Sequence, residues 1–432
     1  MALRRLDLRG VDGDRRALAD VLPRPVDEQD RSSATVAAIL AEVRADGDAA
    51  LRRLTAEFDK VELDDLRVPD AELAAALDRI PAPLRAALEV ARDRIRDYHA
   101  HEAADVPDEF QDGGVTVRHL VRPVARAGCY APGGRARYPS TVLMCAVPAR
   151  VAGVEEIVLC VPPGPDGRVD DATLAAAAVA GVDEVYAVGG AQAVAAMAYG
   201  TASIRAVDVI VGPGNRYVAE AKRQVSGVVG VASAFAGPSE VVVIAGPDTP
   251  SELAAIDLVV QAEHGPDGLA WLITWSEVLL DQVDAAVERI VAASPRRADL
   301  EATLDSGGYA VLVDGPEAAC AVSNVVAPEH LEILVDDAAS LLDLIDSAGA
   351  VFLGTNAPAS VGDYLAGPNH VLPTNRTARF ASALRVDDFR KHIHAVSLDD
   401  EAVRTLGPHV ETLAETEGLP AHAQSVRLRW PG

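Results

Sequence analysis

The stretch VGDYLAGPNHVLPT, residues 361–374, combines one carboxylate, Asp363, with one imidazole, His370. Glycine and proline recur through it, and both disfavour the regular hydrogen-bond ladder of a helix, so an irregular loop is expected. Polar groups held on such a loop are typical of a binding site, although a solvated turn would have the same composition. The other polar segments of the chain decide between these two interpretations.

A second acid–base pair stands in APEHLEILV, where Glu329 and His330 are adjacent just before a predicted strand. Glutamate and histidine are the usual proton-transfer groups near neutral pH. Two neighbouring side chains diverge within a strand, but both can reach one substrate from a loop. The alternative is an exposed acid–base dipeptide without a chemical role.

Nitrogen and oxygen ligands for a metal are available in three distant segments. Gln261 and His264 lie at the carboxyl end of the predicted helix SELAAIDLVVQAEHG, on one face of it. The partial negative charge of a helix carboxyl end favours a cation there. Asp363 and His422, the latter in GLPAHAQ, are further possible ligands. A set without sulfur suits zinc or a similar divalent ion, but spacing alone does not show that the four meet.

Three short predicted strands end in loops rich in glycine, and each loop carries one side chain able to stack or hydrogen-bond. In parallel α/β sheets, ligands bind beyond the carboxyl ends of the strands. The dinucleotide fingerprint GxGxxG is absent, so these loops predict a ligand edge without naming the ligand. The loops are GCYAPGG with Tyr130, GGAQ with Gln192 and GPGN with Asn215.

Strand-like and helix-like segments alternate from about residue 124 to residue 353. This spacing is typical of βαβ units, and it predicts an α/β fold with parallel sheets covered by helices. Residues 1 to about 110 read as helical, AADVPDEFQDGG as a loop, AASLLDLIDSAG as a helix, and the tail from about 384 as mixed.

The composition narrows the class of protein. The 432 residues include 65 acids against 39 bases, for a formal charge of -26, which disfavours nucleic-acid or membrane-surface partners. No signal peptide or membrane-length apolar run is visible, so a cytoplasmic protein is expected. The four cysteines form no CxxC pair, and apolar flanks favour buried, inert thiols over nucleophiles. They are Cys129, Cys145, Cys160 and Cys320.

Taken together and in order, the motifs resemble the histidinol dehydrogenase family over nearly the whole chain. They are GCYAPGG, VGGAQA, VGPGN, AGPSEV, QAEH, APEHLEI, VGDYLAGPNHVLPT and EGLPAH. The resemblance implies the last step of histidine synthesis, in which L-histidinol is oxidised through a bound aldehyde by two NAD in turn, with one zinc per site. On the residues alone, a zinc-dependent aldolase or hydrolase without NAD, or a non-enzymatic acidic binding protein, remains possible.

The resemblance also implies a role for each matching residue. Glu329 and His330 would transfer protons, and Tyr130, Gln192 and Asn215 would contact NAD. Zinc would be held by Gln261, His264, Asp363 and His422. The substrate would meet these four ligands, the proton-transfer pair, and Ser239, His370 and Glu417.

The family organisation implies a homodimer with two incomplete Rossmann-like domains and shared sites. The expected boundaries are a helical segment at 1–26, a first α/β domain at 27–129 with 240–383, a second at 130–239, and a tail at 384–432 that docks on the partner. Three segments depart from the usual family pattern near the motifs: VASAF before AGPSEV, GPDG after QAEH, and NRT after LPT, where a glycine is more usual.

Overall fold

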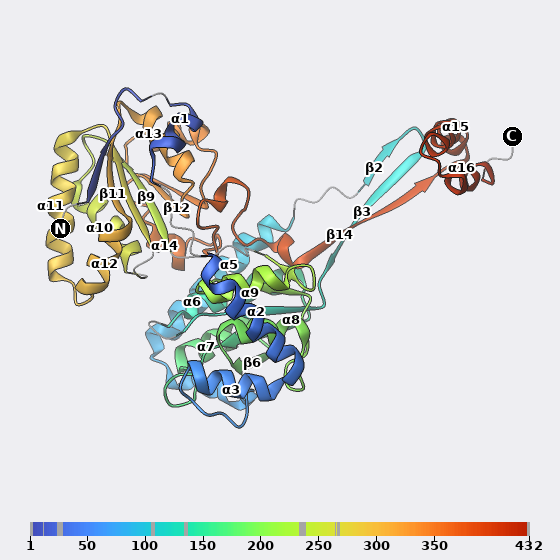
Figure 1. Ribbon diagram of the computed structural model, residues 1–432, viewed down its shortest axis with the longest axis horizontal. Coiled ribbons are helices and arrows are strands. Elements are labelled where there is room, and N and C mark those ends of the chain that lie inside the picture. Colours follow the sequence, from blue (N-terminus) through green and yellow to red (C-terminus); the bar gives the residue numbers. More distant parts are fainter. Residues whose placement is uncertain are drawn as a thin grey trace.

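The structure is a computed structural model that describes residues 3–11, 13–23, 29–104, 109–133, 137–232, 239–263, 265 and 268–429, without the side chains of residues 29–31. Two parallel sheets, each covered by helices, form the body, and a long antiparallel arm extends from it (Figure 1). The α/β fold with parallel sheets that the sequence predicts is confirmed. Among the described helices, none is long and apolar enough to cross a membrane.

The larger sheet has six parallel strands in the order β1-β11-β10-β9-β12-β13. In chain order these are β1 (Arg4–Asp7), β9 (Glu240–Ala245), β10 (Leu269–Thr274), β11 (Gly308–Leu312), β12 (His330–Ile333) and β13 (Ala350–Leu353). One face packs on α10 (Ser251–Ala262), α11 (Glu277–Ala293) and α12 (Arg297–Gly307). The other packs on α1 (Arg15–Val21), α13 (Pro316–Val326) and the 3-10 helix η1 (Ala338–Leu344).

The smaller sheet has five parallel strands in the order β6-β5-β4-β7-β8. They are β4 (Arg126–Tyr130), β5 (Glu156–Val161), β6 (Glu184–Ala187), β7 (Val209–Val211) and β8 (Gly230–Val231). One face packs on α4 (Asp70–Arg79), α5 (Ala82–Glu102), α6 (Pro139–Ala152) and α7 (Asp171–Ala180). The other packs on α2 (Gln29–Asp46), α3 (Asp48–Phe58), α8 (Gly190–Tyr199) and α9 (Arg216–Val225).

The structure groups the N-terminal half differently from the predicted boundaries. Residues 29–104 were joined to 240–383 in that prediction, whereas their helices share cores with the five-stranded sheet. β4 likewise pairs with β5 and β7 of that sheet. The segment 1–26, predicted as helical, contains β1, whose pairing with β11 extends the six-stranded sheet. The apolar stripe of an amphipathic helix indicates that the helix packs on a hydrophobic core, but the stripe does not indicate which of two cores that is.

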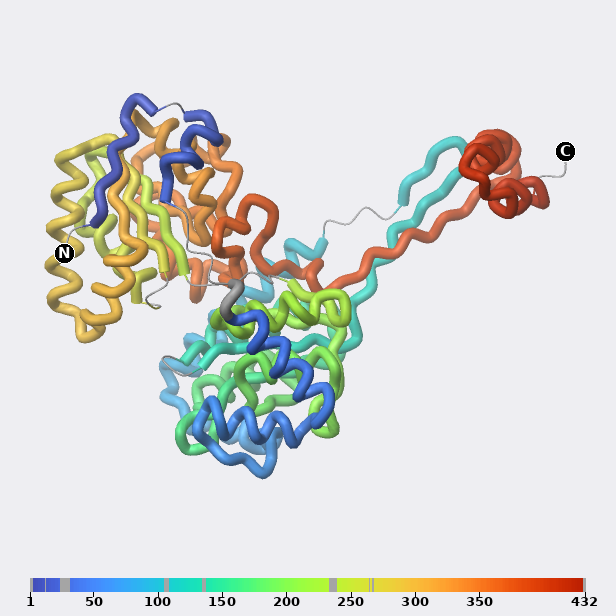
Figure 2. Tube along the Cα trace, viewed as in Figure 1, coloured from blue at the N-terminus to red at the C-terminus, as the bar shows by residue number. Residues whose placement is uncertain are grey.

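The arm consists of β2 (Glu109–Asp112), β3 (Val115–Pro123) and β14 (Arg390–Leu398), and it ends in α15 (Asp400–Thr416) and α16 (Pro420–Arg427). β3 and β14 pair antiparallel over their whole lengths. In the chain trace of Figure 2, the two C-terminal helices lie at the tip of the arm, away from both sheets. The prediction of a loop over AADVPDEFQDGG was wrong for β2, which pairs with β3 across the turn at Gly113 and Gly114. The short, exposed and mostly polar sequence EFQD has no alternating apolar pattern that would indicate a strand.

Two further local predictions were wrong in part. The segment AASLLDLIDSAG forms the 3-10 helix η1 instead of an α-helix. The start of the 361–374 stretch belongs to a short helix, α14 (Ala359–Tyr364), and only the part from Leu365 onward is irregular. The chain turns there at Gly367, whose φ of 111° is in the region that glycine adopts without strain.

Candidate functional site

The 361–374 stretch bridges the two sheets. On one side, Asp363 Oδ1 lies 3.2 Å from Nε2 of His330 on β12. On the other, Nε2 of His370 lies 3.2 Å from the Thr141 hydroxyl of α6. His370 Nδ1 also donates to the backbone carbonyl of Asp363 at 2.8 Å, so the carboxylate and the imidazole of the stretch are held together. Asp363, His330 and His370 therefore meet where the two α/β units meet.

Glu329 and His330 stand at the amino end of β12, beside Glu240 at the amino end of the neighbouring β9. The Glu240 backbone holds both members of the pair: its N–H donates to Glu329 Oε2 at 2.9 Å, and its carbonyl lies 3.1 Å from His330 Nδ1. His330 Nδ1 is also 3.4 Å from Glu329 Oε2. The adjacent acid and base predicted from the sequence are thus fixed by the neighbouring strand rather than exposed.

Within this cluster the pKa values of His330 and Glu240 are raised, and the pKa of His370 is lowered. Burial opposes a charged imidazole, but the carboxylates of Glu329 and Asp363 outweigh it and hold the pKa of His330 well above its ordinary value. Burial lowers the pKa of His370, and the Asp363 carboxylate offsets this only in part. Burial and the nearby Glu329 carboxylate raise the pKa of Glu240 to about 8. Groups shifted in this way within one cluster are typical of an active site.

Gln261, one of the predicted metal ligands, has a buried side-chain amide, neither atom of which has a hydrogen-bond partner among the described residues. Its side chain is 1% exposed. A buried amide without a partner is costly, so a bound group that takes its oxygen as a ligand would remove that cost. Gln261 lies on α10, which packs against β9. This observation fits a metal or a substrate at the site.

Among the described residues, the predicted ligand His422 is not brought to Gln261 and Asp363 within one chain. His264 lies outside the described residues. Glu417 and His422 are exposed and belong to the C-terminal helices at the tip of the arm, away from the sheets that carry Asp363 and Gln261 (Figure 1). Within the described ranges, no group of three or more His, Cys, Asp or Glu side chains is arranged to hold a metal ion.

The three glycine-rich loops meet at the carboxyl edge of the five-stranded sheet. The Gly190 N–H donates to the Tyr130 hydroxyl at 3.1 Å. Gly190 has φ 65°, and a Cβ there would come within 2.5 Å of Gln192 Oε1. Gly212 has φ 108°, and a Cβ there would lie 2.1 Å from the Tyr130 carbonyl oxygen. Glycine thus permits a backbone contact that no other residue would allow.

The three polar side chains of these loops differ in what they do within the chain. Gln192 is 1% exposed, and its Oε1 has no partner among the described residues. Asn215 is exposed and caps α9, since its side-chain oxygen accepts from the Tyr217 and Val218 N–H groups. Tyr130 is buried, which raises its pKa, so its hydroxyl stays neutral. Asn215 and the Tyr130 hydroxyl are therefore each engaged in a hydrogen bond within the chain, whereas Gln192 Oε1 is not.

The four cysteines and a nearby lysine are all inside the molecule. All four thiols are buried and free. Burial raises the pKa of Cys160 to about 12, and the contact with Cys145, followed by burial, raises the pKa of Cys129 well above its ordinary value. Such thiols are poor nucleophiles. Lys222 of α9 is fully buried, its ammonium donates to the Gly212 carbonyl at 2.8 Å, and burial lowers its pKa to about 8.

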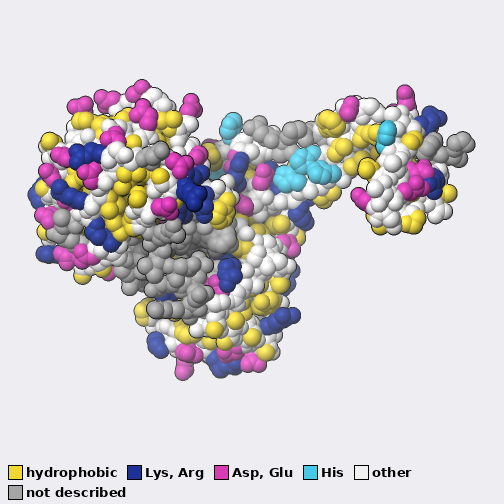
Figure 3. Space-filling view, turned by 45° about the horizontal axis from the view of Figure 1, so that its top comes forward, with side chains coloured by type: hydrophobic (Ala, Val, Ile, Leu, Met, Phe, Trp, Pro, Cys, Tyr) yellow, Lys and Arg dark blue, Asp and Glu magenta, His cyan; other side chains and the backbone are white. Residues whose placement is uncertain are grey.

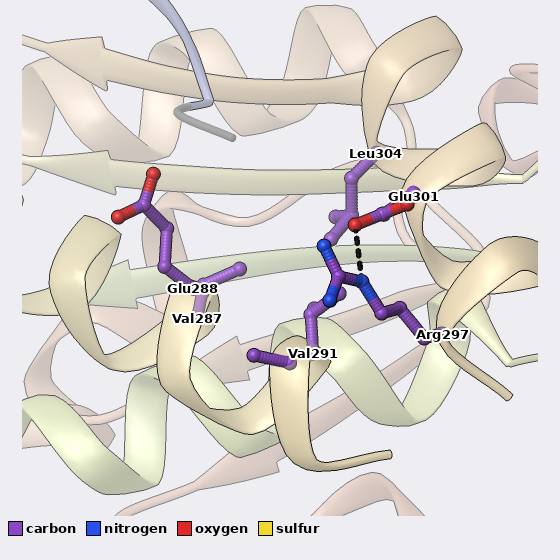
Figure 4. A pocket seen from close by; sticks show the side chains of 7 residues that line it. Val287, Glu288, Val291, Arg297, Glu301 and Leu304 are labelled. Carbon is purple, nitrogen blue, oxygen red and sulfur yellow. Dashed lines mark hydrogen bonds and ion pairs between the residues drawn. The ribbon is translucent and has the colours of Figure 1, made fainter. Parts of the chain in front are cut away.

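A small hollow lies elsewhere, between α11 and α12, where Figure 4 shows Arg297 paired with Glu301 at 2.7 Å. Its volume of about 60 Å³ holds only a few waters, and none of the predicted site residues lines it. The remaining predicted contact, Ser239, is partly buried directly before Glu240, and its carbonyl accepts the Leu269 N–H.

Several residues of the site could not be predicted from the sequence. Glu240, Thr141 and Asn375 reach the cluster from segments that carry no acid–base pattern of their own. The backbone N–H of Asn375 donates to Glu240 Oε1 at 2.9 Å. Asn375 and Arg376, in the NRT segment that departs from the family pattern, have φ values of 53° and 63°. The glycine usual in that segment is a signal of this left-handed turn.

Three comparisons with known proteins agree with one another. The sequence model of the histidinol dehydrogenase family matches residues 22–430. A histidinol dehydrogenase of Bordetella parapertussis is 46% identical over 430 residues, covering 99% of this chain and 97% of that protein. One of Synechococcus is 48% identical over 398 residues, covering 92% of each. The crystal structure of the Elizabethkingia anophelis enzyme superposes with a TM-score of 0.93 at 35% identity, covering 99% of this chain and 98% of that one.

Proposed function

Because this chain belongs to the histidinol dehydrogenase family of oxidoreductases, we propose that it oxidises L-histidinol to L-histidine in two successive two-electron steps, with NAD as the hydride acceptor and zinc at the site. The observation that carries the proposal is the cluster at the amino ends of β9 and β12, where Glu329, His330 and Asp363 meet. It joins a base, an acid and an anionic ligand in one buried place.

His330 is the group that takes the proton of the substrate alcohol as hydride leaves. Its Nδ1 faces the Glu240 carbonyl, so that nitrogen keeps its hydrogen and Nε2 is the nitrogen that exchanges a proton. Nε2 now faces Asp363 Oδ1 at 3.2 Å. Because the raised pKa keeps this imidazole protonated beside Asp363 and Glu329, Nε2 must release its proton, and the substrate hydroxyl must take the place of the Asp363 oxygen, before Nε2 can act as a base.

Glu329 serves the second step, in which the aldehyde becomes an acid. It removes a proton from water that attacks the aldehyde carbon, and the hydrate then loses a hydride to a second NAD. One carboxylate oxygen, Oε2, accepts the Glu240 N–H at 2.9 Å, which fixes the direction of the side chain. Hydration makes a thiol nucleophile unnecessary, in agreement with the burial of all four cysteines.

Gln261, His264 and Asp363 of one chain would hold zinc, together with His422 of a second chain. A bound divalent ion would anchor the imidazole and the amine of the substrate and so orient its alcohol. Orientation alone can lower the reaction barrier by roughly 7–11 kcal/mol at best. The partnerless amide of Gln261 supports this assignment. Ser239, His370 and Glu417 complete the contacts to the substrate.

Tyr130, Gln192 and Asn215 would bind NAD at the carboxyl edge of the five-stranded sheet. At this edge the Gly212 backbone passes so close to the Tyr130 carbonyl that a Cβ would clash with it. The buried Gln192 Oε1 without a partner is an acceptor ready for a ligand. The acidic composition disfavours nucleic acid and anionic membrane surfaces as partners. A biosynthetic role in the cytoplasm belongs to the same proposal and rests on the family.

The test is the formation of NADH from L-histidinol, measured by absorbance with and without a metal chelator. We expect two NADH for each histidinol consumed, and loss of activity after chelation that added zinc restores. Supplied histidinal should yield one NADH. If no NADH forms from histidinol with zinc present, the proposal is wrong.

The C-terminal arm supports a site shared between two chains. Glu417 and His422 lie at the tip of the arm, away from the cluster of their own chain (Figure 1). Large apolar side chains are exposed along the arm and its helices, and Figure 3 shows them there. A surface of this kind favours a partner. They include Phe110 at 62%, Val396 at 60%, Val410 at 42% and Leu413 at 64% exposure.

Mixing two inactive variants tests the shared site. His422→Ala and Glu329→Gln are unfolded together and refolded, so that about half of the dimers are mixed. If His422 acts across the interface, one site in each mixed dimer is intact and roughly a quarter of wild-type activity returns. Mixing His422→Ala with Glu417→Ala is the control, because every site then keeps a damaged tail. No recovery in the first mixture, with mixed dimers shown to be present, would place His422 in the site of its own chain.

A further inference from the structure

Two buried acids that the proposed chemistry does not use lie next to the site. Glu332 is 1% exposed and follows His330 by two residues on β12, so both side chains lie on one face of the strand. Asp257 is 8% exposed and precedes Gln261 by one turn on α10, so these two share a helix face. Each acid is thus tied through its own element to a residue of the site.

Glu332 also contacts α14, the helix that carries Asp363. Glu332 Oε1 accepts the Ala359 N–H at 3.0 Å in a buried hydrogen bond. Ala359 is the first residue of α14, and Asp363 follows one turn later in the same helix. The Glu332 side chain therefore belongs to β12, which carries His330, and bonds to α14, which carries Asp363. Its neighbour Asp257 belongs to α10, which carries Gln261.

The Asp257 carboxyl lies close enough to that of Glu332 to raise the pKa of Glu332, and two buried negative charges so near each other are unfavourable. Two ionised carboxylates offer each other no donor, and Glu332 Oε2 has no other partner among the described residues. Burial, and then the hydrogen bond and charge of Asp257, raise the pKa of Glu332 to about 9, and burial raises the pKa of Asp257 as well. With one proton on Glu332, the pair has a hydrogen bond and a single negative charge near neutral pH.

We infer that Glu332 and Asp257 are a positioning pair that holds β12, α10 and α14 in register, so that His330, Gln261 and Asp363 converge. The inference rests on the proposed function for what the three residues hold, but not for the contact itself. Groups that orient metal ligands from behind commonly change metal affinity by about 10–100-fold when they are removed.

The test compares Glu332→Gln with Glu332→Leu. Glutamine keeps an acceptor for the Ala359 N–H and offers an N–H to Asp257, so it imitates the protonated acid. Leucine fills similar space without either bond. Asp284→Leu is the matched control: Asp284 is a buried acid of the same α/β unit that accepts the Leu3 N–H at 2.8 Å, and none of its contacts reaches the site. Thermal melting establishes that each variant folds.

Zinc affinity, by competition with a chelator, and amide hydrogen exchange of residues 359–365 are the two readouts. We expect Glu332→Leu to bind zinc about 10–100-fold more weakly and to exchange these amides about tenfold faster or more. Glu332→Gln should stay within about threefold of wild type in both, and Asp284→Leu should lower only the melting temperature. If Glu332→Leu matches wild type in both readouts, or if Glu332→Gln is as damaged as Glu332→Leu, the inference is overturned.

A second variant decides the matter if Glu332→Leu does not fold. Asp257→Ala leaves the bond from Ala359 to Glu332 in place, so residues 359–365 should keep their protection while zinc affinity falls about tenfold. Unchanged zinc affinity in Asp257→Ala would overturn the inference. Wild-type protein that binds no zinc and forms no NADH would instead refute the proposed function, and the exchange comparison would still decide whether the pair holds α14.

Discussion

The two parallel sheets present their polar loops from opposite ends of their strands. The five-stranded sheet does so at its carboxyl edge, where Tyr130 ends β4 and Gly212 follows β7. The six-stranded sheet does so at its amino edge, where Glu240 begins β9 and His330 begins β12. With the proposed sites at these edges, the general rule that ligands bind beyond carboxyl ends would describe only one half of this molecule.

The two edges also differ in the residues that carry their unusual backbone. At the five-stranded sheet, left-handed positions are glycines, such as Gly190 and Gly212, whose missing side chains leave room for Gln192 and for the Tyr130 backbone. At the six-stranded sheet, Ala327, Asn375 and Arg376 have positive φ and keep their side chains. Strain of this kind gathers at functional sites, where the surrounding contacts hold it. The edge of the five-stranded sheet therefore has closely packed backbone segments, and the edge of the six-stranded sheet has charged side chains held in fixed positions.

The largest effect is expected at the amino edge of the six-stranded sheet. His330→Asn and Glu329→Gln should each lower kcat by about 10²–10⁴-fold, because each removes a proposed proton-transfer group. Glu329→Gln should slow the aldehyde step more than the alcohol step, since only the former needs an activated water. Stopped-flow measurement of NADH from histidinol and from supplied histidinal separates the two. Normal oxidation of histidinal by Glu329→Gln would remove water activation from its role.

At the carboxyl edge of the five-stranded sheet, space rather than charge should matter. Gly212→Ala places a methyl group 2.1 Å from the Tyr130 carbonyl in a left-handed backbone, so we expect a loss of about 2–3 kcal/mol in unfolding free energy and a raised KM for NAD. Gly227→Ala is the control, because Gly227 has φ 97° and nothing within 4 Å. An equal loss in both variants, measured by urea unfolding, would show that the contact with Tyr130 is unimportant.

The buried acid at the amino edge should make stability depend on pH. Glu240 has an ordinary pKa of 4.5, raised in the folded chain to about 8. The folded chain then holds a proton that the unfolded chain releases, so this contribution is complete below pH 4.5 and is lost as the pH rises through 8. Glu240→Gln should therefore show a shallower fall in unfolding free energy between pH 5 and 8. Parallel curves for the two proteins would contradict the shift.

The buried base of the other sheet should act in the opposite sense. Lys222 has an ordinary pKa of 10.5, lowered to about 8 in the folded chain. The unfolded chain binds the proton more tightly between these values, so stability relative to Lys222→Met should rise from pH 8 to 10.5. Thermal melting of both proteins across that range measures the difference. A difference that falls over the same interval would mean that the ammonium is not penalised by burial.

The smallest effect tests the strained turn beside Glu240. Arg376 has φ 63°, so Arg376→Gly should relieve about 1 kcal/mol of backbone strain, part of which the flexibility of glycine in the unfolded chain cancels. We expect a gain of a few tenths of a kcal/mol with unchanged kcat. A loss of stability would show that contacts of the Arg376 side chain outweigh the strain.

The sequence by itself determined the fold class, the family and the neighbourhood of the acid–base pair. Alternating strands and helices and the eight motifs are local patterns, and short-range backbone preferences and motif spacing are enough to read them. Glu329 and His330 were identified because they are adjacent in the chain. The resemblance likewise indicated the three loops with Tyr130, Gln192 and Asn215, which the structure brings to one edge. Their roles as NAD contacts remain a proposal.

Only the tertiary structure decided which distant segments meet. The packing of residues 29–104 on the five-stranded sheet depends on the match between two surfaces, and no local pattern encodes such a match. The same holds for the contacts of Glu240 with His330 and of Glu332 with Ala359 and Asp257, which join segments far apart in the chain. Burial then sets the proton affinities of these acids, because removal from water penalises a charge that the sequence shows as fully ionised.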